Sequence, residues 1–210
     1  QTVTVAGKKV EVELRVLSAA GVAMSGMCGG SVNWKLTTDG QLIISGTGPM
    51  YDYDMYWFDD DYHMTCDNPA PWFATLQMIQ DHPVTSLVIQ DGVTSIGESA
   101  FVYAKLTEVT IPGSVESIGY SAFGSMKTLQ KVTLEEGVQS IGTMAFLQCE
   151  ALEKLKLPST LTEIGSNAFS GCSKLEELEL PDGITMISSF AFNACSSLKE
   201  VAIPGSVQRM

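Results

Sequence analysis

The segment from Tyr51 to His63 contains the side chains of this sequence that are best suited to bind a ligand. It reads YDYDMYWFDDDYH, so carboxylates stand among aromatic rings. The carboxylates would suit Ca²⁺, but they lack the D-x-D-x-D-G spacing of a calcium loop. The rings would suit a sugar or a peptide, whereas a solvated acidic insertion whose rings pack on the fold needs no ligand. The candidate binding residues are Tyr51, Asp52, Tyr53, Asp54, Tyr56, Trp57, Phe58, Asp59, Asp60, Asp61 and Tyr62.

His63 and Cys66 have the H-x-x-C spacing of a pair of metal ligands. Zinc requires three or four such ligands, and the other candidates in this part of the chain are Cys28 and His82. A single pair is weak support, so the sequence predicts no metal site and no cofactor. In an exported protein, a disulfide between Cys28 and Cys66 is the alternative use of these thiols.

Nucleophilic catalysis requires a base beside a serine or cysteine. The only histidines are His63 and His82, and no G-x-S-x-G, P-loop or dinucleotide-binding motif is present. We therefore predict no catalytic residues and no enzymatic activity.

The charge of the chain limits its partners. Its formal net charge is −12, from 24 acidic and 12 basic residues. Nucleic acids and anionic membrane surfaces attract clustered Lys and Arg, so we expect no nucleic-acid partner. No apolar run approaches the roughly 18 residues of a transmembrane helix, which predicts no membrane insertion. The first residue is Gln1, as expected after removal of a signal peptide, although an engineered start would look the same.

A repeat of 23 residues organises the chain after position 83. Apolar residues recur at unit positions 1, 4, 6, 10, 13 and 18. The L-x-x-L-x-L opening predicts a strand whose alternate side chains face the core, and this period predicts stacked coils of a leucine-rich-repeat solenoid. We expect a parallel β-sheet on one face and little helix. Four full units begin at Leu106, Leu129, Leu152 and Leu175, a copy one residue shorter spans 84–105, and a partial sixth unit ends the chain.

The pattern IPxxVxxIGxxAFxxC in these units resembles the BspA-like leucine-rich repeats of bacterial surface proteins. The resemblance covers residues 84–210. It implies a right-handed solenoid with a curved sheet and a secreted or cell-surface location. In some members it implies binding to host extracellular proteins, but no short binding motif of the family can be placed on this sequence.

Residues 1–83 lack the repeat and are expected to form a β-rich N-terminal cap that carries the acidic aromatic loop. A solenoid needs such a cap because its first coil would otherwise expose core and an unpaired strand edge. Asp39-Gly40 predicts a hairpin turn between strands near 32–37 and 41–45. The stretch 71–79 has Pro in a first helical turn and apolar residues at helical spacing, which predicts a short helix. The alternation around Gly7-Lys8 is typical of another hairpin.

Two columns of the repeat are predicted to be structural core. The phenylalanines at position 18 should stack from coil to coil, and the cysteines at position 21 should be free, buried thiols because Met126 and Ala104 replace them in earlier units. Glycine at position 14 indicates either positive φ or a backbone too crowded for a Cβ atom. The core residues are Phe101, Phe123, Phe146, Phe169, Phe192, Cys149, Cys172 and Cys195.

The outward side chains of the strands form a second candidate surface, on the concave face of the repeats. In a parallel ladder Lys154 would lie beside Glu177, and Lys156 beside Glu179, so that their charges partly neutralise one another. This surface lacks the aromatic residues that dominate binding hot spots. Its residues are Glu108, Lys131, Lys154, Lys156, Glu177 and Glu179.

Two functions remain open from the sequence. The first is an adhesin-like binding module that contacts a host or matrix macromolecule, either an extracellular protein or a glycan. The second is a spacer or display stalk without a ligand of its own, favoured by the charge-balanced strand surface. Met210 stands where earlier units have Ile, and no polar cap follows it, so we expect either a longer natural chain or edge-to-edge self-association at the last coil.

Overall fold

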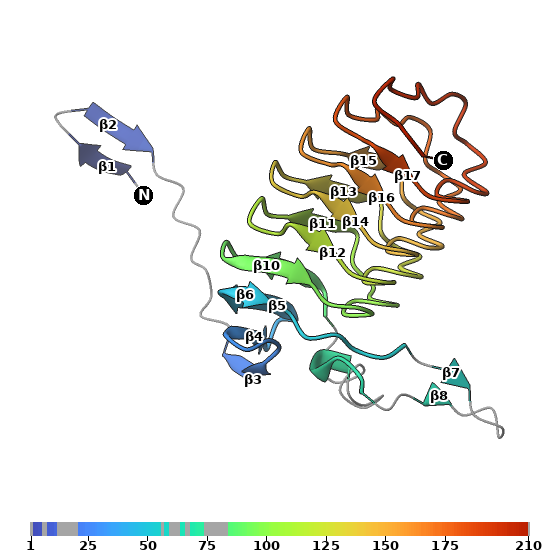
Figure 1. The fold of residues 1–210 in the computed structure, drawn as a ribbon. Coiled ribbons are helices and arrows are strands. Elements are labelled where there is room, and N and C mark those ends of the chain that lie inside the picture. The colour runs from blue at the N-terminus through green and yellow to red at the C-terminus, as the bar shows by residue number, and fades with distance from the viewer. Residues whose placement is uncertain are drawn as a thin grey trace.

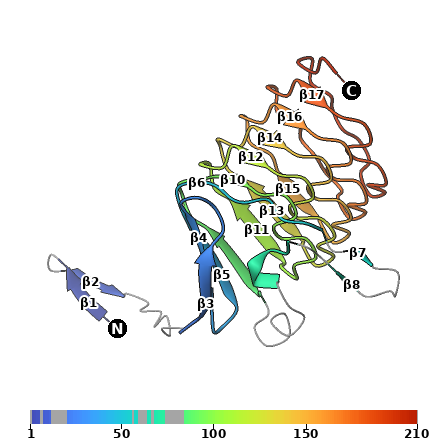
Figure 2. The same cartoon turned by 60° about the horizontal axis from the view of Figure 1, so that its bottom comes forward.

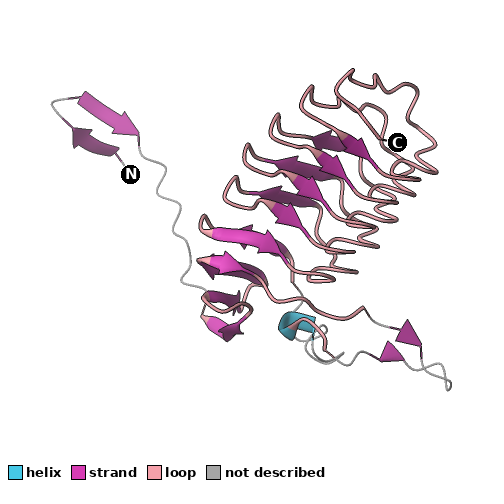
Figure 3. Ribbon diagram, viewed as in Figure 1, coloured by secondary structure: helices cyan, strands magenta, loops and turns pink. Residues whose placement is uncertain are grey.

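The structure is a computed structural model that describes residues 2–5, 8–11, 21–55, 57–58, 64–65, 68–73 and 84–209. Within these ranges the regular structure is almost entirely β-strand, and the one helix is a 3₁₀ turn, η1 (Pro71–Phe73). Figure 1 shows the stacked coils, and Figure 3 shows how short their strands are and how much of each coil is loop.

The N-terminal strands form antiparallel pairs. β1 (Thr2–Val5) pairs with β2 (Lys8–Glu11), which confirms the first predicted hairpin. β3 (Val22–Met27), β4 (Val32–Thr37) and β5 (Gln41–Gly46) form a meander, with the predicted turn between β4 and β5. At that turn Gly40 has φ +85°, a conformation that favours glycine. Its N–H donates to the carbonyl oxygen of Thr37 at 3.0 Å.

The last strand of the meander, β5, pairs with the first strand of the repeats, and this pairing is parallel whereas those within the meander are antiparallel. β9 (Ser86–Ile89) lies parallel to β5, with Leu42 opposite Leu87 and Ile44 opposite Ile89. The edge of the first coil is therefore paired, as a cap requires. The helix predicted over 71–79 is the 3₁₀ turn η1 as far as Phe73, and residues 74–79 lie outside the described residues.

The repeats form two parallel ladders, visible as two rows of arrows in Figure 2. One ladder uses unit positions 3–6, where alternate side chains are buried as predicted. Its strands are β11 (Glu108–Ile111), β13 (Lys131–Leu134) and β15 (Lys154–Lys156).

The second ladder, around unit positions 12 and 13, was not expected from the sequence. There a half-buried residue precedes a buried isoleucine, and the two pair in register from coil to coil, as Ile118 does with Ile141. The isoleucine column was recognised as core, but two residues are too few to show strand alternation. The strands are β6 (Gly48–Pro49), β10 (Val93–Ile96), β12 (Ser117–Ile118), β14 (Ser140–Ile141), β16 (Glu163–Ile164) and β17 (Met186–Ile187).

A stack of aromatic rings runs through the core. Phe123 and Phe146 have ring centroids 5.2 Å apart with an interplanar angle of 5°, and the other neighbouring phenylalanines of position 18 stack similarly. The first four phenylalanines are fully buried, whereas Phe192 is half-buried. Trp72 of the 3₁₀ turn extends the stack into the cap, because its ring lies 5.4 Å from Phe101 and its indole N–H donates to the carbonyl oxygen of Ala100 at 2.9 Å.

The turn that holds each phenylalanine has an unusual backbone. Positions 16 and 20 have positive φ in every coil, for example +59° at Met144 and +56° at Gln148. By contrast, the position-14 glycines have ordinary φ and are required by crowding: a Cβ atom on Gly142 would lie 2.6 Å from the carbonyl oxygen of Ile118. Of the two explanations offered by the sequence, the crowded backbone is therefore right.

Candidate binding site

The start of the acidic aromatic tract is built into the fold rather than displayed as a loop. Tyr53 is 7% exposed and packs edge-on against Trp72, with ring centroids 5.6 Å apart. The carboxylate of Asp52 accepts a hydrogen bond from the backbone N–H of Glu98 at 2.9 Å, which ties the tract to the first coil. The ring of Tyr53 is thus buried beside Trp72 and offers little surface to a ligand, and its contact with one stays a prediction.

The remaining tract residues divide between exposed and undescribed positions. Tyr51 and Asp54 are exposed, and the backbone N–H of Asp54 donates to the carbonyl oxygen of Asn68 at 2.9 Å. Trp57 and Phe58 form β7 (Trp57–Phe58), which pairs antiparallel with β8 (Met64–Thr65). The other candidates lie outside the described residues: Tyr56, Asp59, Asp60, Asp61 and Tyr62. Ligand contact by the tract stays a prediction for its exposed part.

The cysteines of the described residues are free and buried, as predicted for the position-21 column. Burial raises the pKa of Cys28 and of Cys149 to about 12, so neither thiol is a ready nucleophile at neutral pH. The thiol of Cys28 is free in this structure, and the disulfide with Cys66 stays a prediction because Cys66 lies outside the described residues. Within the described part of the chain, no three His, Cys, Asp or Glu side chains are grouped to hold a metal ion.

The second candidate surface is brought together as a groove of about 710 Å³ on the outer face of β13 and β15 and of the coils that follow. Lys131 and Lys154 are register partners in the ladder, which places their side chains side by side. Of the predicted face residues only Glu108 lies outside the groove, and it reaches Lys131 at 3.9 Å. The charged and polar lining consists of Lys131, Thr133, Glu153, Lys154, Lys156, Glu176, Glu177, Glu179, Lys199 and Glu200.

The groove exists because the ladder of positions 3–6 ends at β15. The N–H groups of Glu153 and Lys154 donate to Gln130 of the previous coil, but no backbone hydrogen bond joins residues 153–157 to residues 175–180, all of which are described. The second ladder and the phenylalanine turns continue unbroken past this point. The coils are thus held together on two sides and separate on the third.

Separation of the coils also opens the core at the floor of the groove. Leu155 and Leu157 are half-buried, whereas their counterparts one coil earlier, Val132 and Leu134, are 1% exposed. Leu155, Leu157 and Leu178 line the groove between its charged rims. The site therefore offers an apolar floor between two groups of charged side chains, beside the unpaired edge of β15.

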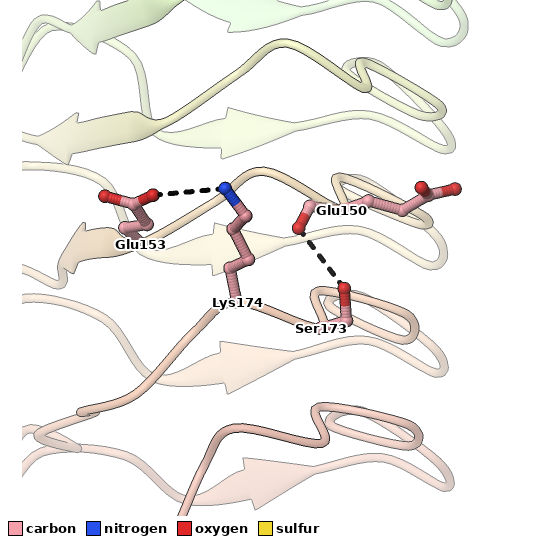
Figure 4. Close-up of polar contacts among 4 residues, drawn as sticks. All are labelled: Glu150, Glu153, Ser173 and Lys174. Atoms are coloured by element: carbon pink, nitrogen blue, oxygen red, sulfur yellow. Dashed lines mark hydrogen bonds and ion pairs between the residues drawn. The ribbon is translucent and has the colours of Figure 1, made fainter.

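The charges on the two rims do not neutralise one another in the predicted way. Lys154 and Lys156 make no ion pair with Glu177 or Glu179 within 4.0 Å, because β15 does not pair with residues 176–179. The ion pairs of the repeats connect other residues: Lys127 with Glu150 at 3.4 Å, and Lys174 with Glu153 at 3.5 Å. Figure 4 shows the second pair beside the hydrogen bond from the hydroxyl of Ser173 to the carbonyl oxygen of Glu150.

Glu136 is a further charged residue near the lysines of the groove. The carboxylate of Glu136 accepts hydrogen bonds from the hydroxyl and the backbone N–H of Ser159, and these bonds, with a smaller contribution from nearby Lys156, lower its pKa. Both carboxylate oxygens of Glu136 accept hydrogen bonds from Ser159, which lies in the turn after β15. Lys154 has no such acidic neighbour in an ion pair.

A second opening of about 510 Å³ lies between β9 and β11, where the same ladder is also interrupted. Half of its lining residues are apolar, among them Leu87, Val88 and Pro112, and its only charged residues are the carboxylates Asp91 and Glu135. The sequence holds a signal for this break, because the unit from 84 to 105 is one residue short. It holds no comparable signal for the break after β15, where the units keep 23 residues and the leucines keep their alternation.

Stacked coils with parallel ladders, an aromatic core column and a β-rich cap define a capped leucine-rich-repeat solenoid. The model of the family described as "BspA type Leucine rich repeat region (6 copies)" matches residues 94–210, more than half of the chain. The chain therefore belongs to the BspA-type leucine-rich repeat family, as its repeat pattern indicated. A comparison with curated proteins finds no match.

Solved structures of bacterial proteins have a similar fold. A leucine-rich repeat protein from Eubacterium ventriosum is 27% identical, with a TM-score of 0.69 over 87% of this chain and 44% of that one. A leucine-rich cell surface protein from Faecalibacterium prausnitzii is 25% identical, with a TM-score of 0.53 over 88% of this chain and 44% of its own. The T. pallidum leucine-rich repeat protein, 24% identical, has a TM-score of 0.53 over 85% of this chain and 72% of that one, which shows the fold alone. This chain thus spans less than half the length of the first two.

Family membership indicates a protein-interaction module of a kind that is generally non-catalytic and typically found on the cell surface or secreted. Among the described residues, no helix has the length and apolar character needed to cross a membrane.

Proposed function

We propose that this chain is an adhesin-like, non-enzymatic binding module of a secreted or surface-displayed bacterial protein, and that it contacts a host or matrix protein through the groove beside β15. The observation that supports this is the interruption of the ladder. A solenoid that served only as a spacer would gain stability from closing the ladder, since each paired strand adds hydrogen bonds and buries leucine side chains. Here two leucines remain half-buried instead.

The shape and chemistry of the groove suit a protein ligand. Its volume of about 710 Å³ leaves room for side chains of a partner. Its rims carry charges that would orient a partner, and its floor supplies apolar surface for affinity. The absence of aromatic rings from its lining argues against a carbohydrate, which usually stacks on such rings.

The experiment is binding of the purified chain to immobilised extracellular-matrix proteins and glycans. The groove variant carries Lys154→Glu with Lys156→Glu, and the matched control carries Lys35→Glu with Lys105→Glu, two exposed lysines outside the groove. Both variants change the net charge equally, so only the location differs. Saturable binding to a protein that the groove variant loses and the control keeps is the expected result.

The acidic aromatic tract is tested in the same assay with Trp57→Ala and Phe58→Ala. Deletion of the whole tract is unsuitable, because it would remove the buried ring of Tyr53 and the Asp52 contact to the first coil. If only this variant loses binding, the ligand site is the tract and the groove proposal is wrong.

The spacer remains the second candidate, supported by the aromatic-poor lining of the groove. It predicts no saturable binding to any member of the panel by the wild-type chain or its variants.

A further inference from the structure

The two rims of the groove carry opposite charges in separate blocks. On the side of β13 and β15 stand Lys131, Lys154 and Lys156, and on the side of the following coil stand Glu176, Glu177 and Glu179. Glu153 also lies on the lysine side, but Lys174 pairs with it at 3.5 Å. The last coil contributes one residue of each charge to the lining of the groove, Lys199 and Glu200.

These blocks are held apart by the fold. In an intact parallel ladder, the two strands would lie about 4.8 Å apart and their lysines and glutamates would pair directly. The break in the ladder prevents this, and in the described chain no ion pair within 4.0 Å joins Lys154 or Lys156 to Glu177 or Glu179. The site is therefore a fixed dipole, positive toward β15 and negative toward residues 176–179, above an apolar floor.

A partner that neutralises both blocks must carry the opposite dipole. A partner with only acidic residues would be attracted by the lysines and repelled by the glutamates, and a purely basic one the reverse. An extended chain advances about 3.3 Å per residue, so a short segment can reach from the coil of β15 to the coil of residues 176–179.

We propose that the groove binds an extended segment of a partner protein in which an acidic cluster adjoins a basic cluster. The acidic cluster lies over Lys154 and Lys156, and the basic cluster lies over Glu177 and Glu179. Apolar parts of the segment contact Leu155 and Leu178 on the floor. This inference rests on the proposed function of the groove and adds the chemistry of its ligand.

The probe is an end-blocked fluorescent peptide of three glutamates, two glycines and three lysines. Its control is a peptide of identical composition in which glutamate and lysine alternate, so that net charge and length are equal and only the block pattern differs. Binding is measured by fluorescence polarisation at low ionic strength and again with added salt. We expect the block peptide to bind about tenfold more tightly than the alternating one, and less tightly as salt screens the rims.

Charge-swap variants test the orientation of the dipole. Lys154→Glu with Lys156→Glu, and separately Glu177→Lys with Glu179→Lys, should each weaken block-peptide binding by about tenfold, because each removes one of the two opposite charge pairs that the peptide would contact. The fourfold swap reverses the dipole and should restore binding, since the peptide can lie in the opposite direction. The variant with Lys35→Glu and Lys105→Glu should bind as the wild type does. Circular dichroism of each variant shows that it is folded before binding is measured.

Equal binding of the two peptides, or affinity unaffected by either pair of swaps, would overturn the bipolar ligand. The proposed function fails in a different way. If neither peptide binds but the groove variant still loses a protein ligand of the matrix panel, the groove is a binding site and only its bipolar chemistry is wrong.

Discussion

The thiol of Cys149 donates a hydrogen bond to the carbonyl oxygen of Phe123 in the preceding coil, 3.2 Å away. The next two coils repeat this contact, from Cys172 to Phe146 at 3.4 Å and from Cys195 to Phe169 at 3.2 Å. Each cysteine therefore links the phenylalanine turns of two coils, and the column that looked like a set of small apolar residues also satisfies buried backbone acceptors.

The raised pKa of these thiols predicts how the fold responds to alkaline pH. Burial raises the pKa of Cys149 from 9.0 to about 12, so the folded chain keeps this thiol protonated where the unfolded chain ionises it. Below pH 9 the thiol has no effect on the pH dependence of stability. Between pH 9 and 12 it lowers the free energy of unfolding by about 1.4 kcal/mol per pH unit. Urea unfolding of wild type and Cys149→Ala at pH 8 and pH 10 should show a smaller alkaline loss in the variant; an equal loss would contradict the burial of this thiol.

The phenylalanine stack predicts a difference between the middle and the end of the solenoid. Phe146 is fully buried between two rings at 5.2 Å, so Phe146→Ala should lower the free energy of unfolding by about 3 to 5 kcal/mol. Phe192 is half-buried and stacks on one described ring at 5.6 Å, so Phe192→Ala should cost clearly less. Urea denaturation measures both. A loss below about 1 kcal/mol for Phe146→Ala would show that the column does not support the core.

The buried hydroxyl of Tyr53 in the cap is the basis for a stabilising substitution. Its hydroxyl oxygen is buried and has no hydrogen-bond partner, and burial raises its pKa. Tyr53→Phe keeps the ring against Trp72 and removes the unsatisfied group, so the free energy of unfolding should rise by about 1 kcal/mol. Tyr53→Ala is the matched control and should destabilise by about 3 kcal/mol or more, because it removes the ring. Loss of stability in Tyr53→Phe would mean that the hydroxyl has a partner in solution.

The features of the fold that could be predicted from the sequence are those at positions that repeat every 23 residues. The burial of Val109 and Ile111 and the stack of Phe101 to Phe192 follow from positions that recur along the repeats, and crowding was one of the two explanations that the glycine column allowed. Trp72 could not be assigned to that stack, because it lies outside the period and reaches Phe101 through the folding of the cap.

The candidate site was predicted only in part, for a similar reason. Register placed Lys131, Lys154 and Lys156 on one face, and the structure brings them into one groove. The pairing of Lys154 with Glu177 was inferred from an unbroken ladder, and the break after β15 depends on how successive coils stack, which alternation of leucines within one coil does not encode. For the same reason Leu155 and Leu157 were assigned to the core rather than to the floor of a groove.

The left-handed residues of the phenylalanine turn predict a second stabilising change. Gln148 has φ +56°, and the equivalent position of the next unit is Gly171 with φ +80°. A side chain in this conformation costs about 1 to 2 kcal/mol, which glycine avoids, while glycine adds about 0.5 to 1 kcal/mol of chain entropy to the unfolded state. Gln148→Gly should therefore raise the free energy of unfolding by up to about 1 kcal/mol. Gln148→Ala keeps the Cβ atom and the strain, so it should give no such gain. Urea unfolding of both variants decides the matter: equal stability would mean that the turn relaxes around residue 148 and that its left-handed backbone stores no strain.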